Sequence, residues 1–179
     1  MLDAAGVEHE VVPADVDEKA VRSSLTDPSA IAGELAAAKA LAVSAGRPDD
    51  WVIGSDSVVE VGGRIFAKPG SRAEAAEHLR AFSGKPMRLT SAVALARRGI
   101  EDWRHAEAAT LTVRALSDRF IETYLDAEWP EVGYTVGVFR LEGRGVQLFE
   151  RIDGDYFVIL GMPLIPLLGA LRERGIIPA

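Results

Sequence analysis

Asp56 is the residue whose type and position most strongly suggest chemistry. It lies in the segment WVIGSDSVVEVGGRIFAKPG, residues 51–70, where the neighbouring residues favour a buried strand: Val52, Ile53, Val58 and Val59. An unpaired carboxylate in such surroundings costs several kcal/mol. The aspartate therefore either bonds backbone amides at a capped strand end or serves a reaction. On spacing alone the two interpretations are equally supported.

Two lysines and a glutamate have positions that suit the same chemistry. Lys39 lies beside the apolar positions of an expected helix, where a lysine can also simply extend its stem along apolar surface. Lys68 precedes Pro69, which favours an extended backbone and a side chain that leaves a strand end, although a solvated loop lysine has the same pattern. Glu18 belongs to an acidic segment after a short expected strand. Taken singly, each lysine fits a structural role better than a functional one.

Taken together, these four residues are the groups needed to hydrolyse a phosphoanhydride. Carboxylates hold a divalent metal and orient water, while lysines offset the charge that develops on phosphate oxygens. The sequence contains no GxxxxGK[ST] motif and no GxGxxG after an expected strand, which argues against a P-loop or Rossmann nucleotide site. The glycines of LEGRG are only two residues apart and indicate a hairpin turn rather than a phosphate cradle.

Composition excludes several other classes of protein. The chain has 179 residues, 48% of them hydrophobic, and suits one domain over residues 1–179. It has no cysteine, which excludes disulfides and thiolate sites and favours the cytoplasm. The three histidines are scattered, so a histidine-built metal site is not expected. A net charge of −7 argues against nucleic-acid or membrane binding, and no apolar run approaches the ~20 residues of a membrane span.

The elements that must position these residues follow from hydrophobic spacing and from cap and turn residues. Helices are expected over residues 28–45, 72–83, 118–125 and 163–174, with Asp27, Ser71 and Ser117 as N-caps. Strands are expected at residues 11–12, 51–59, 64–69, 87–96, 109–115 and 146–152, with a hairpin turn at 62–63 and another at Gly99. Residues 132–145 are rich in glycine and aromatic residues and indicate a loop that could bind a ligand. Interleaved helices and strands predict an α/β layered domain around a mixed sheet.

The order and residues of several motifs resemble those of the Maf family of nucleoside triphosphate pyrophosphatases. The similarity covers almost the whole chain and is carried by these segments: DVDE, LAAAKA, VIGSDSVV, GRIFAKP, EAAEHLRAFSG and GYTVGVFRLEGRGVQLFERIDGDYFVILGMPL. The resemblance implies a Maf/ITPase-like fold, with helices flanking a central sheet and a cleft between two lobes. In the family one cleft is lined by the residues that match Glu18, Lys39, Asp56 and Lys68.

The resemblance also implies the reaction. A nucleoside triphosphate would be split between its α and β phosphates into a monophosphate and pyrophosphate, with Mg²⁺ or Mn²⁺ as the divalent metal cation. Asp56 would be the general base, Lys39 and Lys68 would bind phosphates, and Glu18 together with Asp56 would hold the metal. A role in nucleotide house-cleaning, a link to septum formation and a homodimer are further features that the resemblance implies.

The sequence departs from the family pattern at several places. The family has an S-x-S-x-x-R strand before the segment matched by MLDAAGV, and this sequence lacks it, so either the start is placed late or the protein lacks that strand. In this form we expect low solubility or compensating dimerisation. Ser57 replaces a usual threonine, and Glu142 stands near a glutamine that recognises the base. A glutamate only accepts hydrogen bonds, so the base preference would differ. Met87 replaces a histidine and is expected to pack in the core.

The sequence also fits two other functions. Absence of the arginine motif favours a catalytically impaired nucleotide-binding protein that regulates septum formation or cell division. An interaction module is the third alternative, in which Asp56 has only a structural role.

Overall fold

A computed structural model describes residues 1–178 of the chain. The chain forms two compact units. Unit 1 comprises Met1–Ser57, Thr90–Glu107 and the described residues from Asp155 onward. Unit 2 comprises Val58–Leu89 and Ala108–Gly154.

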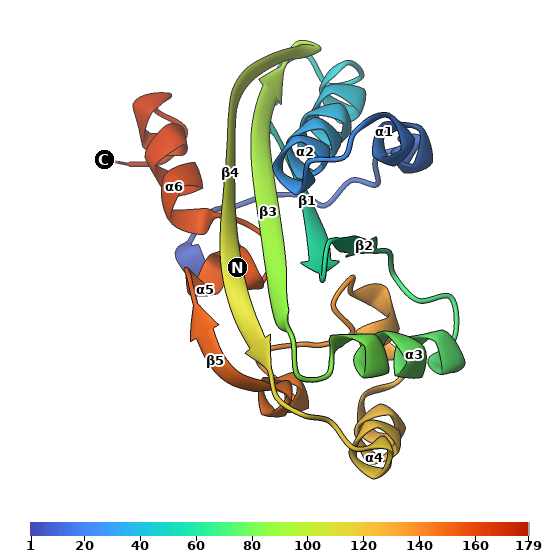
Figure 1. Cartoon of the computed structure of the whole chain (residues 1–179). Coiled ribbons are helices and arrows are strands. Elements are labelled where there is room, and N and C mark those ends of the chain that lie inside the picture. The colour runs from blue at the N-terminus through green and yellow to red at the C-terminus, as the bar shows by residue number, and fades with distance from the viewer. Residues whose placement is uncertain (179) are drawn as a thin grey trace. The chain divides into compact units, whose positions relative to one another are not determined.

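One five-stranded sheet supplies strands to both units. Its strands are β1 (Val52–Val61), β2 (Arg64–Phe66), β3 (Pro86–Arg97), β4 (Ile100–Val113) and β5 (Phe149–Asp153), in the order β2-β1-β3-β4-β5. Neighbouring strands run in opposite directions (Figure 1), and the β1–β2 and β4–β5 pairs are antiparallel. The α/β layered architecture is thus confirmed, while the sheet is antiparallel rather than mixed. Every neighbouring pair can therefore form without a parallel crossover.

The hairpin expected at residues 62–63 is present in unit 2. Gly62 and Gly63 have φ angles of 60° and 78°, which glycine adopts without steric cost, and Glu60 pairs with Ile65 across the turn. The long β3–β4 hairpin also contains the expected turn, at Gly99 with φ 72°. Strand β4 begins at Ile100, well before the start expected from the sequence. The expected start was too late because the first half of the strand carries polar residues that conceal the strand pattern.

Four helices belong to unit 1: α1 (Glu18–Ser24), α2 (Pro28–Ser44), α5 (Tyr156–Ile159) and α6 (Leu164–Glu173), with a 3₁₀ turn, η1, at Asp3–Ala5. The Asp27 cap of α2 is confirmed, since its carboxylate accepts a hydrogen bond from the Ala30 amide. Figure 1 shows α1 beside α2. Helix α6 packs on β3 through an apolar cluster that includes these residues: Val93, Leu95, Leu164, Leu167 and Leu171.

The expected strand around Val11 and Val12 is wrong. These residues have no regular structure, and Val11 is 83% exposed. The acids that follow it do not end a strand. Instead, Asp17 caps α1 by accepting a hydrogen bond from the Ala20 amide at 3.0 Å, which places Glu18 in the first turn of a helix that sequence reasoning missed.

Unit 2 contains α3 (Arg72–Phe82) and α4 (Asp118–Glu128), which pack together, and two 3₁₀ turns, η2 (Glu131–Tyr134) and η3 (Arg144–Leu148). Both expected caps are confirmed: the Ser71 hydroxyl accepts from the Glu74 amide, and the Ser117 hydroxyl accepts from the Phe120 amide. The strand expected from residue 146 begins only at Phe149, because η3 occupies the residues before it. Met87 is 1% exposed, as its expected core role requires.

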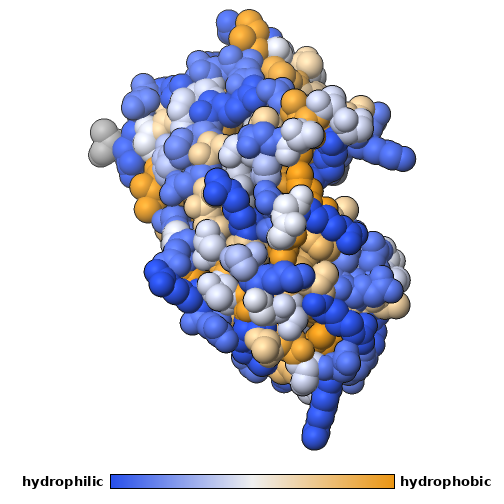
Figure 2. All heavy atoms as spheres, viewed as in Figure 1, coloured by the Kyte–Doolittle hydropathy of each residue, from blue (hydrophilic) through white to orange (hydrophobic). Residues whose placement is uncertain are grey.

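Hydrophilic residues cover most of the face seen in Figure 2, with apolar residues scattered among them. Of the helices formed by residues 1–178, none has both the length and the apolar character that crossing a membrane requires.

Candidate active site

Close contact between α2 and β1 is what creates the site in unit 1. At Gly54 an added Cβ would lie 2.1 Å from the Ala36 carbonyl oxygen and 2.6 Å from the Ala40 amide nitrogen, so only glycine permits this approach. The helix face that meets the strand is alanine-rich, and Ala36 and Ala40 are both fully buried. Small residues on both sides therefore bring the backbone of α2 down onto β1, with Lys39 beside this contact and Asp56 two residues beyond Gly54.

Four charged side chains form a ring of alternating sign at this contact. The Lys39 ammonium donates to Asp56 Oδ1 and approaches Glu18 Oε1, both at 2.7 Å. Arg22 Nη2 donates to Asp56 Oδ2 at 3.1 Å and lies 3.8 Å from Glu18 Oε2. Each carboxylate thus lies between the same two cations, and the ring, defined by Glu18, Arg22, Lys39 and Asp56, carries no net charge.

The two carboxylates of the ring differ in their exposure to solvent, and burial changes the pKa of Asp56. The Asp56 side chain is 8% exposed, against 45% for Glu18. Burial raises the pKa of Asp56 above its ordinary value, although the hydrogen bond and charge of Lys39 and the charge of Arg22 act in the opposite direction. A carboxylate that holds a proton more tightly than usual suits a general base.

Lys39 remains charged in this environment. Burial on its own would lower the pKa of the ammonium, but hydrogen bonds and charges from Asp56 and Glu18 outweigh burial and raise the pKa. A charged lysine half-removed from solvent and close to a buried carboxylate can stabilise the charge on a phosphate oxygen.

Arg22 is the residue of the ring that sequence reasoning missed. Its spacing from Glu18, four residues along the chain, is the signal that could have found it, since side chains at i and i+4 lie on one face of a helix. That signal depends on recognising α1, and the sequence pattern predicts only an acidic segment with Asp15, Asp17 and Glu18 there. No spacing rule connects either residue to Asp56.

The serines on either side of Asp56 make bonds to other parts of unit 1. Ser55 donates to the Gly161 carbonyl at 2.8 Å. The Ser57 hydroxyl lies 2.7 Å from that of Ser91 and also bonds the Gly161 carbonyl at 3.4 Å. Because successive side chains of a strand face opposite sides, Ser55 and Ser57 tie β1 to the turn between α5 and α6, while Asp56 faces α2. These bonds fix the strand that carries Asp56.

The other two residues expected in the site belong to unit 2. Lys68 follows β2 and is exposed, in accord with a side chain that leaves a strand end. Glu142 is also exposed, just before η3, in the glycine-rich segment that was expected to be a loop. This segment is anchored to α4 by the buried Tyr124 hydroxyl, which donates to the Val138 carbonyl at 3.0 Å.

A groove of about 800 Å³ in unit 1 reaches the ring at Glu18 and Lys39. Its volume is within the range of small-molecule sites. Carboxylates outnumber cations along its walls, which include Glu8, Glu10, Asp49 and Asp50 against Lys39 and Arg47. A polyphosphate bound here would therefore need cations of its own.

The donor set of the ring fits a magnesium-like ion held jointly with a phosphate. Residues 1–178 contain no cluster of three or more acidic or histidine side chains that could enclose a metal by themselves. Mg²⁺, however, is commonly held by one or two carboxylates together with substrate phosphates. Asp56 and Glu18 supply two carboxylates that already share one cation, the Lys39 ammonium.

Comparison with known proteins gives one consistent result. The family described as Maf-like protein matches residues 1–174. A "7-methyl-GTP pyrophosphatase" of Rhizobium etli is 48% identical over 99% of this chain and 91% of its own length. A "Nucleoside triphosphate pyrophosphatase" of Nitrobacter hamburgensis is 46% identical over 99% of this chain and 89% of its own length. A "7-methyl-GTP pyrophosphatase" of Rhizobium meliloti is 45% identical over 100% of this chain and 92% of its own length.

Proposed function

The chain belongs to the family of Maf-like proteins, and we propose that it is a nucleoside triphosphate pyrophosphatase, a hydrolase that releases a nucleoside monophosphate and pyrophosphate. The observation that supports the proposal best is Asp56, a buried carboxylate that Lys39 and Arg22 hold on a strand. Two relatives with this activity in their names match nearly the whole chain, which favours the enzyme over an impaired nucleotide-binding protein.

In the proposed reaction Asp56 accepts a proton from the attacking water. The water oxygen forms a bond to the α-phosphorus, and the bond between that phosphorus and the oxygen bridging to the β-phosphate breaks. Its electron pair leaves with pyrophosphate. The raised pKa of Asp56 favours acceptance of the proton, provided that the carboxylate is ionised beforehand.

Lys39 and Lys68 bind phosphate oxygens in this proposal. Lys39 is positioned by two carboxylates, and a phosphate would take over the role of one of them as an anionic partner. Lys68 is exposed and so is accessible to a ligand. Because the whole chain carries a net charge of −7, a triphosphate must be attracted by such local cations rather than by the protein's overall charge.

Glu18 and Asp56 are the proposed metal ligands, with Mg²⁺ or Mn²⁺ as the metal. The bound ion would supply neutralisation of phosphate charge during bond cleavage. Glu18 is the more exposed of the two carboxylates and is therefore the better placed to share the ion with a substrate phosphate.

The proposed substrate is a nucleoside triphosphate with a modified base, and 7-methyl-GTP is the first to test because two relatives carry it in their names. Glu142 is the proposed base contact, since it is exposed and its carboxylate can accept hydrogen bonds from base amino or imino groups. Ser57 stays a prediction as a substrate contact, and its hydroxyl bonds lead to Ser91 and Gly161. The reaction would take place in the cytoplasm, and a homodimer is the proposed assembly.

The proposal is tested by following all phosphate-containing products from a panel of canonical and methylated triphosphates with Mg²⁺ or Mn²⁺. Monophosphate and pyrophosphate should appear in equal amounts, and chelation of the metal should stop their release. Orthophosphate as the first product would indicate cleavage at another phosphoanhydride and contradict the proposal. Nucleotide binding without any product would favour the regulatory alternative instead.

A further inference from the structure

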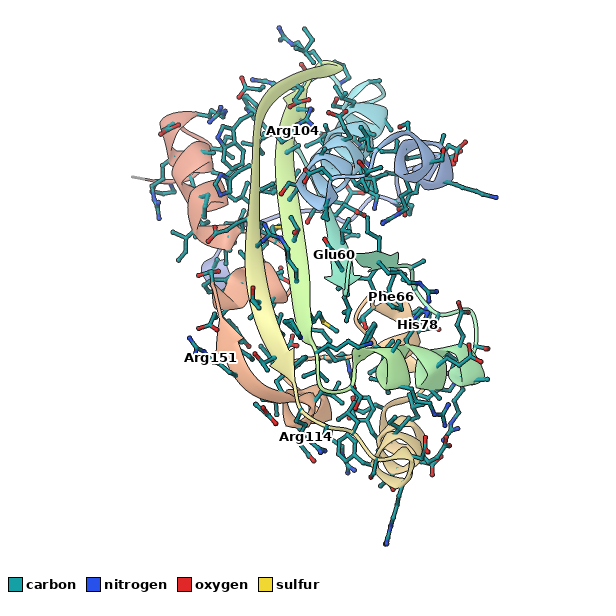
Figure 3. The ribbon with its side chains drawn as sticks, in the orientation of Figure 1. Glu60, Phe66, His78, Arg104, Arg114 and Arg151 are labelled. Carbon is teal, nitrogen blue, oxygen red and sulfur yellow. The ribbon has the colours of Figure 1, made fainter. Side chains whose placement is uncertain are left out.

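Arg22 has bonding capacity that the ring does not use. Nη2 donates to Asp56 Oδ2 at 3.1 Å, while Nη1 is buried and has no hydrogen-bond partner within residues 1–178. A buried donor of a charged group that has no acceptor lowers the stability of the fold. Such a donor beside a reactive carboxylate suggests that it bonds a ligand. Figure 3 labels Arg104, another arginine of unit 1 that pairs with two carboxylates.

The position of Arg22 follows from the reaction geometry. The attacking water must contact Asp56, and the attacking and leaving oxygens of a phosphoryl transfer lie roughly in line. The leaving pyrophosphate is therefore on the side of the α-phosphorus away from Asp56. A guanidinium bonded directly to Asp56 lies on the water's side of the α-phosphoryl group, where the oxygens that stay with the monophosphate product are found.

The charges of the ring are consistent with this position. In the ring, Arg22 and Lys39 neutralise Glu18 and Asp56. A divalent cation shared by the two carboxylates would offset the same charge and leave both side-chain cations available to phosphate. The planar guanidinium, with two N–H groups side by side, matches a pair of phosphate oxygens better than an ammonium does.

We propose that Arg22 is a phosphate-binding residue that contacts the α-phosphoryl oxygens of the substrate and of the monophosphate product. This inference rests on the proposed function and adds to it a guanidinium contributed by α1. Arg22 thus has two partners at once: Asp56 through Nη2, and the α-phosphoryl group through the N–H groups that Asp56 does not occupy.

The variant Arg22→Gln tests the proposal, with Arg22→Lys as the conservative change. Arg22→Gln should lower kcat/KM about 10- to 100-fold, the effect expected for loss of one hydrogen bond to a charged group, and Arg22→Lys should recover part of the loss. Arg104→Gln is the matched control, because Arg104 also bridges two carboxylates, Glu34 at 2.6 Å and Glu101 at 2.8 Å, and is similarly buried. It should retain wild-type kcat/KM.

Product binding distinguishes a phosphate contact from a purely structural role. With Mg²⁺ present, calorimetry of Arg22→Gln should show at least fivefold weaker binding of nucleoside monophosphate and unchanged binding of inorganic pyrophosphate. Wild-type monophosphate affinity in this variant, or equal weakening for both products, would overturn the inference. These titrations need no turnover, so they decide the role of Arg22 even if the wild-type protein hydrolyses no triphosphate, which would overturn the proposed function separately. If Arg22→Gln does not fold, the same titrations with Arg22→Lys decide it.

Discussion

At the scale of single residues, the question posed by Asp56 is how a carboxylate can be kept on a buried strand. The structure answers it with partners from two helices: Lys39 from α2 and Arg22 from α1. Breaking a buried pair by removing one partner leaves an uncompensated charge, which is strongly unfavourable. Lys39 and Arg22 therefore stabilise the ionised Asp56 carboxylate in the absence of a ligand, and all three charged groups are in place when a ligand binds.

The raised pKa of Asp56 predicts the acid side of the activity profile. A general base must be ionised, so kcat/KM should fall as pH is lowered through the pKa of Asp56. Because burial raises that pKa, the midpoint of the fall should lie above 3.8, the ordinary value for aspartate. Rates measured across a pH series, with unfolding monitored in parallel, check this. A profile that stays level down to pH about 4 would contradict the assignment of Asp56 as the base.

At the scale of elements, the contact between α2 and β1 explains two features of the sequence together. The alanines around Lys39 and the glycine before Ser55 are both needed for the same close approach. The helix period and the strand pattern were readable separately, but the requirement that their small residues face each other is a tertiary fact. Periodicity predicted both elements and could not predict that they cross at this point.

Gly54→Ala should disrupt the site by separating the two elements. The new methyl group would lie 2.1 Å from the Ala36 carbonyl, so α2 must move and carry Lys39 away from Asp56. We expect a loss of about 1–3 kcal/mol in the free energy of unfolding and a marked loss of activity. Gly169→Ala is the matched control, because the α6 glycine has no atom within 4 Å of an added Cβ and alanine favours a helix. Equal stability of the two variants would show that the contact is not as tight as described.

In unit 2, the packing of α3 on β2 predicts a dependence of stability on pH. His78 is buried against Phe66, with ring centroids 5.0 Å apart, and Figure 3 shows both side chains. Burial lowers the pKa of His78 below 6.5; the charges of Glu74 and Glu77 oppose this, and that of Arg64 adds to it. The unfolded state therefore binds the proton more tightly. Stability is at its full value above pH 6.5 and falls as pH drops through the folded pKa.

His78→Leu should remove that dependence, because leucine fills the site without titrating. Denaturant unfolding at pH 7.5 and pH 5.5 should show a smaller difference in the free energy of unfolding for the variant than for the wild type. An unchanged difference would mean that other groups carry the pH dependence.

At the scale of the whole molecule, the sequence predicted the layered α/β architecture, most helix boundaries and three residues of the ring. Caps such as Asp27 and Ser71 and glycine turns account for much of this success, because local chemistry determines them. The prediction failed where tertiary packing decided the outcome. Val11 is apolar yet exposed, Arg22 acquires its role only through the fold of α1, and Ser57 bonds the turn after α5.

Pyrophosphate release by Asp56→Asn and by Asp102→Asn, measured side by side, decides whether Asp56 is the general base. Asp102 is also a strand aspartate paired with an arginine, Arg174, but lies outside the ring, so its variant should release pyrophosphate at the wild-type rate. Asp56→Asn should lower kcat about 10²- to 10⁴-fold while the protein remains folded, since asparagine cannot accept the proton. Undiminished pyrophosphate release by folded Asp56→Asn protein would contradict the role of Asp56 as the general base.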